Sequence, residues 1–297
     1  MKTLFELAFR DQRKLNAFIK TCEAMTAHSD TALFKVKTRG VYILLTDFES
    51  LCCLETRLTE NIKNMLKMNC SEFTAKILLD SLTNILRKIA RNKHSAILYA
   101  DSEKPQTLQI KETIGQSHRT VEQYTVESTE HRARVYYVLS TNEFREKSKD
   151  YLQFRIPNVE FNKIITMQSI LSGNNGGVGE IVVTPVPDEP DQPKSRVEIK
   201  FFLKNQSGAM GGVTIHSRCG DDSLSVPVQH IPKETIRTQY FLTYLKRSQT
   251  MFTVPSDFVT LLISEKGILV QTDPKENNHY IVIFLSDISD LDLDSFV

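Results

Sequence analysis

The chain has 297 residues, of which 40% are hydrophobic and 25% charged, and this composition is typical of a globular protein long enough for two domains. It contains no apolar run of about 18 residues, so we expect no membrane contact. The charged residue Glu6 interrupts the N-terminal stretch before an apolar core can form, so we expect no secretory signal. Five scattered cysteines without a CxxC pair favour buried thiols in a reduced, intracellular protein. The formal net charge of +1 indicates no class of partner by itself.

The first half begins with a predicted strand and an amphipathic helix. Apolar residues alternate over Thr3–Arg10, and Asp11 can cap a helix over Gln12–Met25. A second helix is expected over Leu79–Arg91, because apolar residues recur there at i, i+3, i+4 and i+7. The other strands expected in this half are Ala32–Thr38, Val41–Asp47, Leu51–Leu58, Glu72–Leu78, Ala96–Ala100, Thr107–Glu112 and Thr120–Glu127.

The second half gives the same order of elements. A strand over Tyr151–Ile156 leads through a Pro-Asn turn into a helix over Val159–Leu171, and a second helix is expected over Lys233–Ser248. The other strands expected in this half are Glu180–Pro185, Arg196–Leu203, Val213–Ser217, Ser223–His230, Phe258–Ser264, Gly267–Thr272 and His279–Leu285.

This shared order reflects an internal repeat. The stretch LAFRDQRKLNAFIK, residues 7–20, lies on LQFRIPNVEFNKII, residues 152–165, with one gap. The second helices align with Arg87 on Lys246 and Lys88 on Arg247. Each copy is large enough to be a domain, so we predict domains over residues 1–138 and 151–297, joined by an exposed, polar connector over residues 139–150.

Positive charge concentrates in the four predicted helices. They sum to +7, so the rest of the chain sums to −6. One interpretation is solubilising helix faces, with cations drawn to the C-terminal turns by the helix dipole. The scarcity of acidic residues in both second helices favours a surface that neutralises phosphates instead, without reading bases. The candidate DNA-binding residues are Arg13, Lys14, Lys20, Arg87, Lys88, Arg91, Lys163, Arg237, Lys246 and Arg247.

Several stretches together resemble one family. They are GVYILLTDFESLCCLE at residues 40–55, FRIPNVEFNKIITMQSILSG at residues 154–173, and YLKRSQTMFTVPSDFVTLLISEKGILVQTD at residues 244–273, followed by HYIVIFLSDI. These stretches and the repeated module are similar to the sliding clamps related to proliferating cell nuclear antigen. The resemblance implies an α+β fold of two tandem clamp domains, with helices lining a DNA-facing surface and antiparallel sheets outside.

The same resemblance implies function and partners. The chain would be a DNA sliding clamp and polymerase processivity factor that encircles or tracks double-stranded DNA and tethers DNA polymerase and other replication proteins. A pocket beneath the connector would bind those partners. The residues that the resemblance places there are Asp47, Leu51, Leu139, Phe144, Val254, Pro255, Leu285, Ser286 and Asp287. Ordinary core packing is the alternative for each apolar member.

Departures from the family pattern leave the assembly open. The chain is near neutral where cellular clamps are acidic, residues 126–138 hold an extra segment RARVYYV, and the tail SDLDLDSFV alternates acidic and apolar residues. These features resemble divergent clamps such as DNA-virus processivity factors. A homotrimer is favoured over a dimer, a monomer or a checkpoint-type heterotrimer, acting in the nucleus or at a site of viral DNA replication.

No motif indicates catalysis. The stretch GNNGGVG at residues 173–179 follows a helix and lacks the Lys-Ser/Thr ending of a phosphate loop, and no G-x-S-x-G elbow occurs. We therefore expect a non-enzymatic protein without a cofactor or metal. The alternatives are a clamp-fold scaffold for transcription or DNA-damage checkpoint partners, and a DNA-processing enzyme whose carboxylates converge only in the fold.

Overall fold

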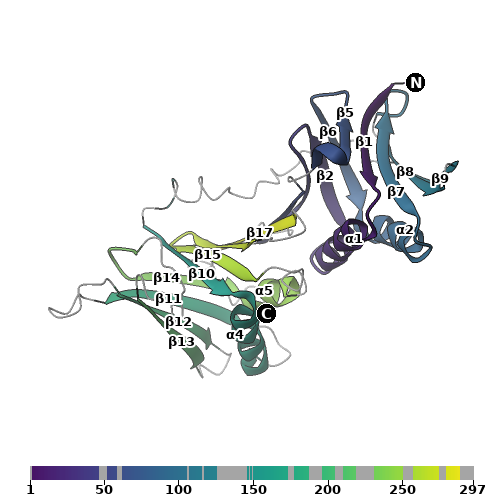
Figure 1. Ribbon diagram of the computed structural model, residues 1–297. Helices are drawn as coiled ribbons and strands as arrows, with labels where there is room; N and C mark the ends of the chain where they lie inside the picture. Colours follow the sequence, from purple (N-terminus) through teal and green to yellow (C-terminus); the bar gives the residue numbers. More distant parts are fainter. Residues whose placement is uncertain are drawn as a thin grey trace. The chain divides into compact units, whose positions relative to one another are not determined.

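The structure is a computed structural model. It describes residues 2–46, 52–58, 62–105, 107–115, 117–125, 146, 148, 150–172, 177–186, 196–204, 210–218, 231–249, 257–273 and 279–287. The chain divides into two compact units (Figure 1), the first built mainly from β1 to β9 with α1 and α2, and the second mainly from β10 to β17 with α4 and α5. Within the described residues, no helix is both long enough and apolar enough to span a membrane.

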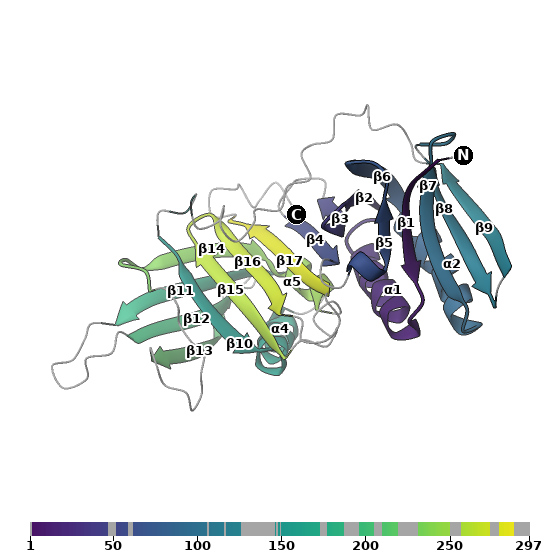
Figure 2. The ribbon, with the colours of Figure 1, turned by 45° about the horizontal axis from the view of Figure 1, so that its top comes forward.

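The first unit contains two antiparallel arrays of strands and a pair of helices. The helices are α1 (Gln12–Thr26) and α2 (Leu79–Arg91), which pack against each other. One array runs β5–β1–β7–β8–β9 and the other β4–β3–β2–β6, and Figure 2 shows β1, β7, β8 and β9 side by side. The strands are β1 (Thr3–Phe9), β2 (Thr31–Lys37), β3 (Gly40–Thr46), β4 (Cys52–Leu58), β5 (Leu66–Met68), β6 (Glu72–Leu78), β7 (Ser95–Asp101), β8 (Thr107–Ile114) and β9 (Ser117–Thr125), with a short 3-10 helix over Ile62–Asn64.

The second unit repeats this plan. Its helices α4 (Asn158–Ser172) and α5 (Leu242–Ser248) also contact each other. One array runs β10–β15–β16–β17 and the other β13–β12–β11–β14. The strands are β10 (Leu152–Pro157), β11 (Val178–Val186), β12 (Arg196–Lys204), β13 (Met210–Arg218), β14 (Ile236–Phe241), β15 (Phe258–Ser264), β16 (Gly267–Asp273) and β17 (His279–Ser286).

The pairing of strands confirms the internal repeat. In the first unit, β1 pairs with β7, β7 with β8, β8 with β9, β2 with β3, and β2 with β6. The second unit has the equivalent pairs β10–β15, β15–β16, β16–β17, β11–β12 and β11–β14, and all of these pairs are antiparallel. The two halves therefore share one topology, as the aligned sequences predict.

The aligned apolar residues form equivalent parts of two cores. Leu7 and Phe9 of β1 are completely buried, as are Leu152 and Phe154 of β10. The helix positions behave alike, since Leu15 and Ile19 of α1 and Phe161 and Ile165 of α4 are all buried. At the start of α1, the Oδ1 of Asp11 accepts a hydrogen bond from the backbone N of Arg13 at 2.8 Å, which confirms the predicted cap.

The helix predicted over Lys233–Ser248 is wrong in its first half. Residues Ile236–Phe241 form strand β14, and the helix begins only at Leu242. Ile236, Thr238 and Tyr240 are buried while Arg237 is exposed, so the burial alternates with the period of a strand. The aromatic and β-branched residues of this segment favour a strand, and the prediction missed them because Tyr240 and Tyr244 also have helical spacing.

This correction shifts the alignment of the second helices by one turn. The backbone N of Leu79 donates to the carbonyl of Asp30 at 2.8 Å, and the backbone N of Leu242 donates to the carbonyl of Gly177 at 2.9 Å. These equivalent bonds pair Leu79 with Leu242. Lys246 is therefore equivalent to Thr83, not to Arg87, and the error went unseen because four residues are about one helical turn.

Other expectations differ only in detail or concern residues outside the described ranges. Strand β5 and the short 3-10 helix were not expected, because each is only three residues long. The strand predicted over Ser223–His230, the segment RARVYYV and the tail after Asp287 lie outside the described residues, as does most of the connector.

Candidate nucleic-acid interface

Helices α1 and α2 share a buried apolar side and expose a polar strip. On α1, the apolar side includes Leu15, Phe18 and Cys22, and the exposed positions include Arg13 and Lys20, two turns apart. On α2, Leu82, Ile85, Leu86 and Ile89 are buried, and the exposed positions are Asp80, Asn84, Lys88, Arg91. The two helices pack against each other, and the partly exposed pair of Glu23 and Arg87 joins them, so the two strips border one surface of the first unit.

Four cations on this surface are available to an external anion. Arg13, Lys20, Lys88 and Arg91 are exposed, and within the described part of the chain none of them is in an ion pair. Lys14 is only partly exposed. Lys88 and Arg91 lie in the last turn of α2, where the helix dipole also favours a positive charge.

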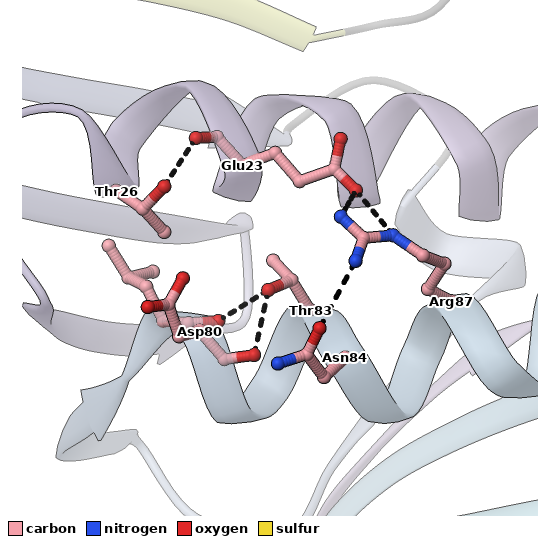
Figure 3. A network of polar contacts seen from close by, with 7 residues as sticks. Glu23, Thr26, Asp80, Thr83, Asn84 and Arg87 are labelled. Atoms are coloured by element: carbon pink, nitrogen blue, oxygen red, sulfur yellow. Dashed lines mark hydrogen bonds and ion pairs between the residues drawn. The ribbon is translucent and has the colours of Figure 1, made fainter.

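Arg87 is held differently from its neighbours. Its Nε and Nη2 both donate to Oε1 of Glu23 on α1, at 3.0 and 2.5 Å, and its Nη1 donates to Oδ1 of Asn84 at 3.1 Å (Figure 3). The carboxylate therefore compensates the charge of the guanidinium. No local pattern predicts this contact, because Glu23 and Arg87 are 64 residues apart.

The second unit offers fewer cations. Lys246 and Arg247 are exposed in the last turn of α5. Lys163 of α4 forms an ion pair with Glu160 at 2.7 Å, and the same helix exposes the apolar side chains of Val159, Met167, Ile170. The prediction of Arg237 on a helix is wrong, since this residue lies on β14, where its guanidinium is 3.7 Å from the carboxylate of Glu180.

The helices carry most of the positive charge of the chain. Together α1, α2, α4 and α5 hold nine basic and three acidic side chains, a net charge of +6. The whole chain has a net charge of +1, so the remaining residues sum to −5. Lys and Arg on helix surfaces can neutralise phosphates, and such contacts fix position without carrying sequence information.

Solved structures match this fold over nearly the whole chain. The crystal structure of proliferating cellular nuclear antigen from Entamoeba histolytica has a TM-score of 0.62 at 13% sequence identity, and the match covers 96% of this chain and 99% of that one. The PCNA2–PCNA3 complex from Sulfolobus tokodaii gives a TM-score of 0.62 at 13% identity, with 95% and 98% covered. The fold is that of a sliding clamp. No protein-family profile and no curated protein sequence matches the chain.

The clamp fold is therefore α+β and includes both units, as the sequence predicts. The identity of 13% shows shared architecture and no more. In this clamp fold, the helices α1, α2 and α5 carry the exposed cations described above. Glu23, which pairs with Arg87, is a member of this surface that no sequence pattern indicates.

Part of the candidate partner site lies in the described residues. Leu285 of β17 is buried with 1% of its surface exposed, so its side chain belongs to the core. The Oδ1 of Asp287 accepts from the backbone N of Gln239 at 2.7 Å, and its own backbone N donates to the carbonyl of Lys266 at 3.1 Å. Ser286 is the last residue of β17. The other candidates lie outside the described residues: Asp47, Leu51, Leu139, Phe144, Val254 and Pro255.

The described residues contain no group of three His, Cys, Asp or Glu side chains that could hold a metal ion. The thiol of Cys22 is completely buried in α1, and this burial raises its pKa far above the ordinary value, with a smaller contribution from the charge of Glu23. A thiol in this state is unreactive.

Proposed function

We propose that this protein is a DNA sliding clamp and polymerase processivity factor, which encircles or tracks double-stranded DNA without reading its sequence. The observation that supports it is the set of exposed cations on α1, α2 and α5, carried by a sliding-clamp fold whose remaining residues are net acidic. Such a protein acts where DNA is replicated, in the nucleus or at a site of viral DNA replication.

The binding to DNA that such a surface requires is weak. Flexible Lys and Arg side chains replace counterions at phosphates, and the binding falls steeply as salt rises. A few contacts of this kind, spread over several helices, allow a protein to move along a duplex. The tether to a polymerase then raises the effective concentration of the polymerase at the primer end.

Self-association would use the free edges of the sheets. Among the described strands, β9 is the last in one array of the first unit and β13 is the last in one array of the second. An exposed edge presents unpaired N–H and C=O groups that can pair with another strand. Pairing of β9 of one copy with β13 of the next would extend the chain into a ring. A homotrimer is favoured and a dimer is the alternative.

The test replaces four cations by glutamine: Lys88, Arg91, Lys246 and Arg247. Each lost phosphate contact should lower the slope of log K against log salt by about 0.9, so the four together should lower it by up to about 3.6. Duplex binding is measured at several salt concentrations, and polymerase product length is measured in parallel. Both should fall.

A control of equal charge takes its cations from strands, where Lys35 and Lys37 pair with Glu72 and Lys67 pairs with Glu6. Lys35, Lys37, Lys67 and Lys76 lie on β2, β5 and β6. Their replacement by glutamine should leave the salt slope and product length close to those of the unmodified protein. Equal losses in both variants would show that only the total charge matters, and the assignment of the helices to DNA would fail.

The exposed apolar residues of α4 favour a second candidate, a clamp-fold scaffold for transcription or checkpoint partners. Val159 and Ile170 have 67% and 74% of their surface exposed, on a helix with no net charge. A scaffold of this kind would show no effect of either set of substitutions on polymerase product length.

A further inference from the structure

Glu23 is an acidic residue on a helix whose other charged residues are basic. It is the only acidic residue of α1, it lies one turn beyond Lys20, and its side chain points to α2 (Figure 3). Within the described residues, its carboxylate forms an ion pair with Arg87 alone. The carboxylate therefore lies on a surface whose other charged positions on α1 are basic.

The contact occupies much of the hydrogen-bonding capacity of Arg87. A guanidinium has five N–H donors. Two of them are directed to Oε1 of Glu23 and a third to Oδ1 of Asn84. Among the described residues, the neighbouring cations Lys88 and Arg91 have no such ion pair, so Arg87 is the basic residue of α2 whose charge is already compensated.

The pair is also accessible to a competing anion. The side chain of Arg87 is 42% exposed and that of Glu23 is 35% exposed. Exposed ion pairs contribute little to stability, because water screens them. A phosphate could take the place of the carboxylate, but it would first have to approach the negative charge of Glu23.

We propose that Glu23 limits the affinity of this surface for DNA by compensating Arg87, so that the duplex is held loosely enough to slide. This inference rests on the proposed clamp function, and it adds a regulating residue to the same surface. Glu23 thus sets the number of effective cations on α1 and α2, and its removal frees one of them.

The test is the isosteric substitution Glu23→Gln. The amide oxygen can still accept from Arg87, so the packing of the helices is kept while the negative charge is removed. One additional phosphate contact should steepen the salt slope by about 0.9, which makes duplex binding about eightfold tighter at 0.1 M salt and about twofold tighter at 0.5 M. Binding is measured by fluorescence anisotropy with a labelled duplex of arbitrary sequence, and thermal unfolding verifies the fold.

Two further variants isolate the pair from the total charge. Glu72→Gln changes the net charge equally, but Glu72 lies on β6, where it pairs with Lys35 and Lys37. It should leave duplex affinity within about twofold. The double variant Glu23→Gln with Arg87→Gln restores the original net charge of the surface and should bind about as tightly as the unmodified protein, whereas Arg87→Gln alone should bind more weakly.

The outcomes separate the two proposals. If the unmodified protein binds no duplex even at low salt, the clamp function fails and this inference fails with it. If the protein binds duplex but Glu23→Gln leaves affinity and salt slope unchanged, the clamp function stands and the role of Glu23 is wrong. The same conclusion follows if the double variant binds as weakly as Arg87→Gln alone.

Discussion

Substitution of Gly179 by alanine tests strand β14, which the sequence pattern assigned to a helix. Gly179 of β11 lies opposite Tyr240 of β14 in the antiparallel pair. A Cβ atom at Gly179 would lie 2.5 Å from Cζ and 2.8 Å from Oη of Tyr240. These distances are far below van der Waals contact, so either the ring or the strand has to move.

The surroundings of Tyr240 make that movement costly. The ring is completely buried, its hydroxyl donates to Oε1 of Gln168 at 3.0 Å, and Nε2 of Gln168 donates to the carbonyl of Phe202 at 3.2 Å. Overpacking a core costs about 1–3 kcal/mol, and loss of the buried hydrogen bond adds about 1 kcal/mol. Gly179→Ala should therefore lower the free energy of unfolding by about 2–4 kcal/mol.

Urea unfolding followed by circular dichroism measures this loss, and Tyr240→Leu provides the decisive comparison. Removal of the ring abolishes the clash, so the double variant should lose less stability than the sum of the two single variants. Gly115→Ala is the control, because a Cβ atom there has no neighbour within 4 Å and only its positive φ of 59° opposes the change. If Gly179→Ala costs less than about 0.5 kcal/mol, or if the two single losses add, β14 does not lie beside β11 in this register.

Two further predictions concern the first unit. Asp11→Ala removes the N-cap of α1 and should cost about 1 kcal/mol, measured as a lower urea midpoint. The backbone N–H of Lys104 donates to Asp101 and holds the pKa of that carboxyl below its usual range, with a further bond from Gln109 and an opposing effect of burial. The stabilisation by Asp101 is therefore fully present above the unfolded pKa of about 3.9 and is lost as the pH falls through the lower folded pKa. The difference in urea midpoint between the unmodified protein and Asp101→Asn should shrink between pH 6 and pH 2, and a constant difference would contradict the assignment.

Local patterns in the sequence were sufficient for most of the fold. The strand Glu72–Leu78 and the helix Leu79–Arg91 have the bounds that the sequence predicts. Buried residues recur about every two residues in the strand and about every 3.6 residues in the helix, and neither pattern is interrupted. Because the two halves of the sequence align, the order of elements in the first half also predicted the order in the second unit.

The remaining features depend on contacts between distant residues. The Glu23–Arg87 pair joins two helices, and no local pattern on α1 or α2 indicates it. Arg237 was placed on the wrong element because helical spacing and strand alternation coincide over a short aromatic segment. Leu285 was assigned to a docking pocket by resemblance, whereas its burial follows from its position in β17 opposite Ile268.

The central claim is that the helix faces, and not the strands, meet duplex DNA. A photo-crosslinking amino acid in place of Lys88 or Lys246 tests this most directly, with the same amino acid in place of Lys37 or Lys76 for comparison. Irradiation should join the protein to duplexes of unrelated sequence from the positions on α2 and α5, and not from those on β2 and β6. Crosslinks that arise from the strand positions, or from neither set at low salt, would contradict the account.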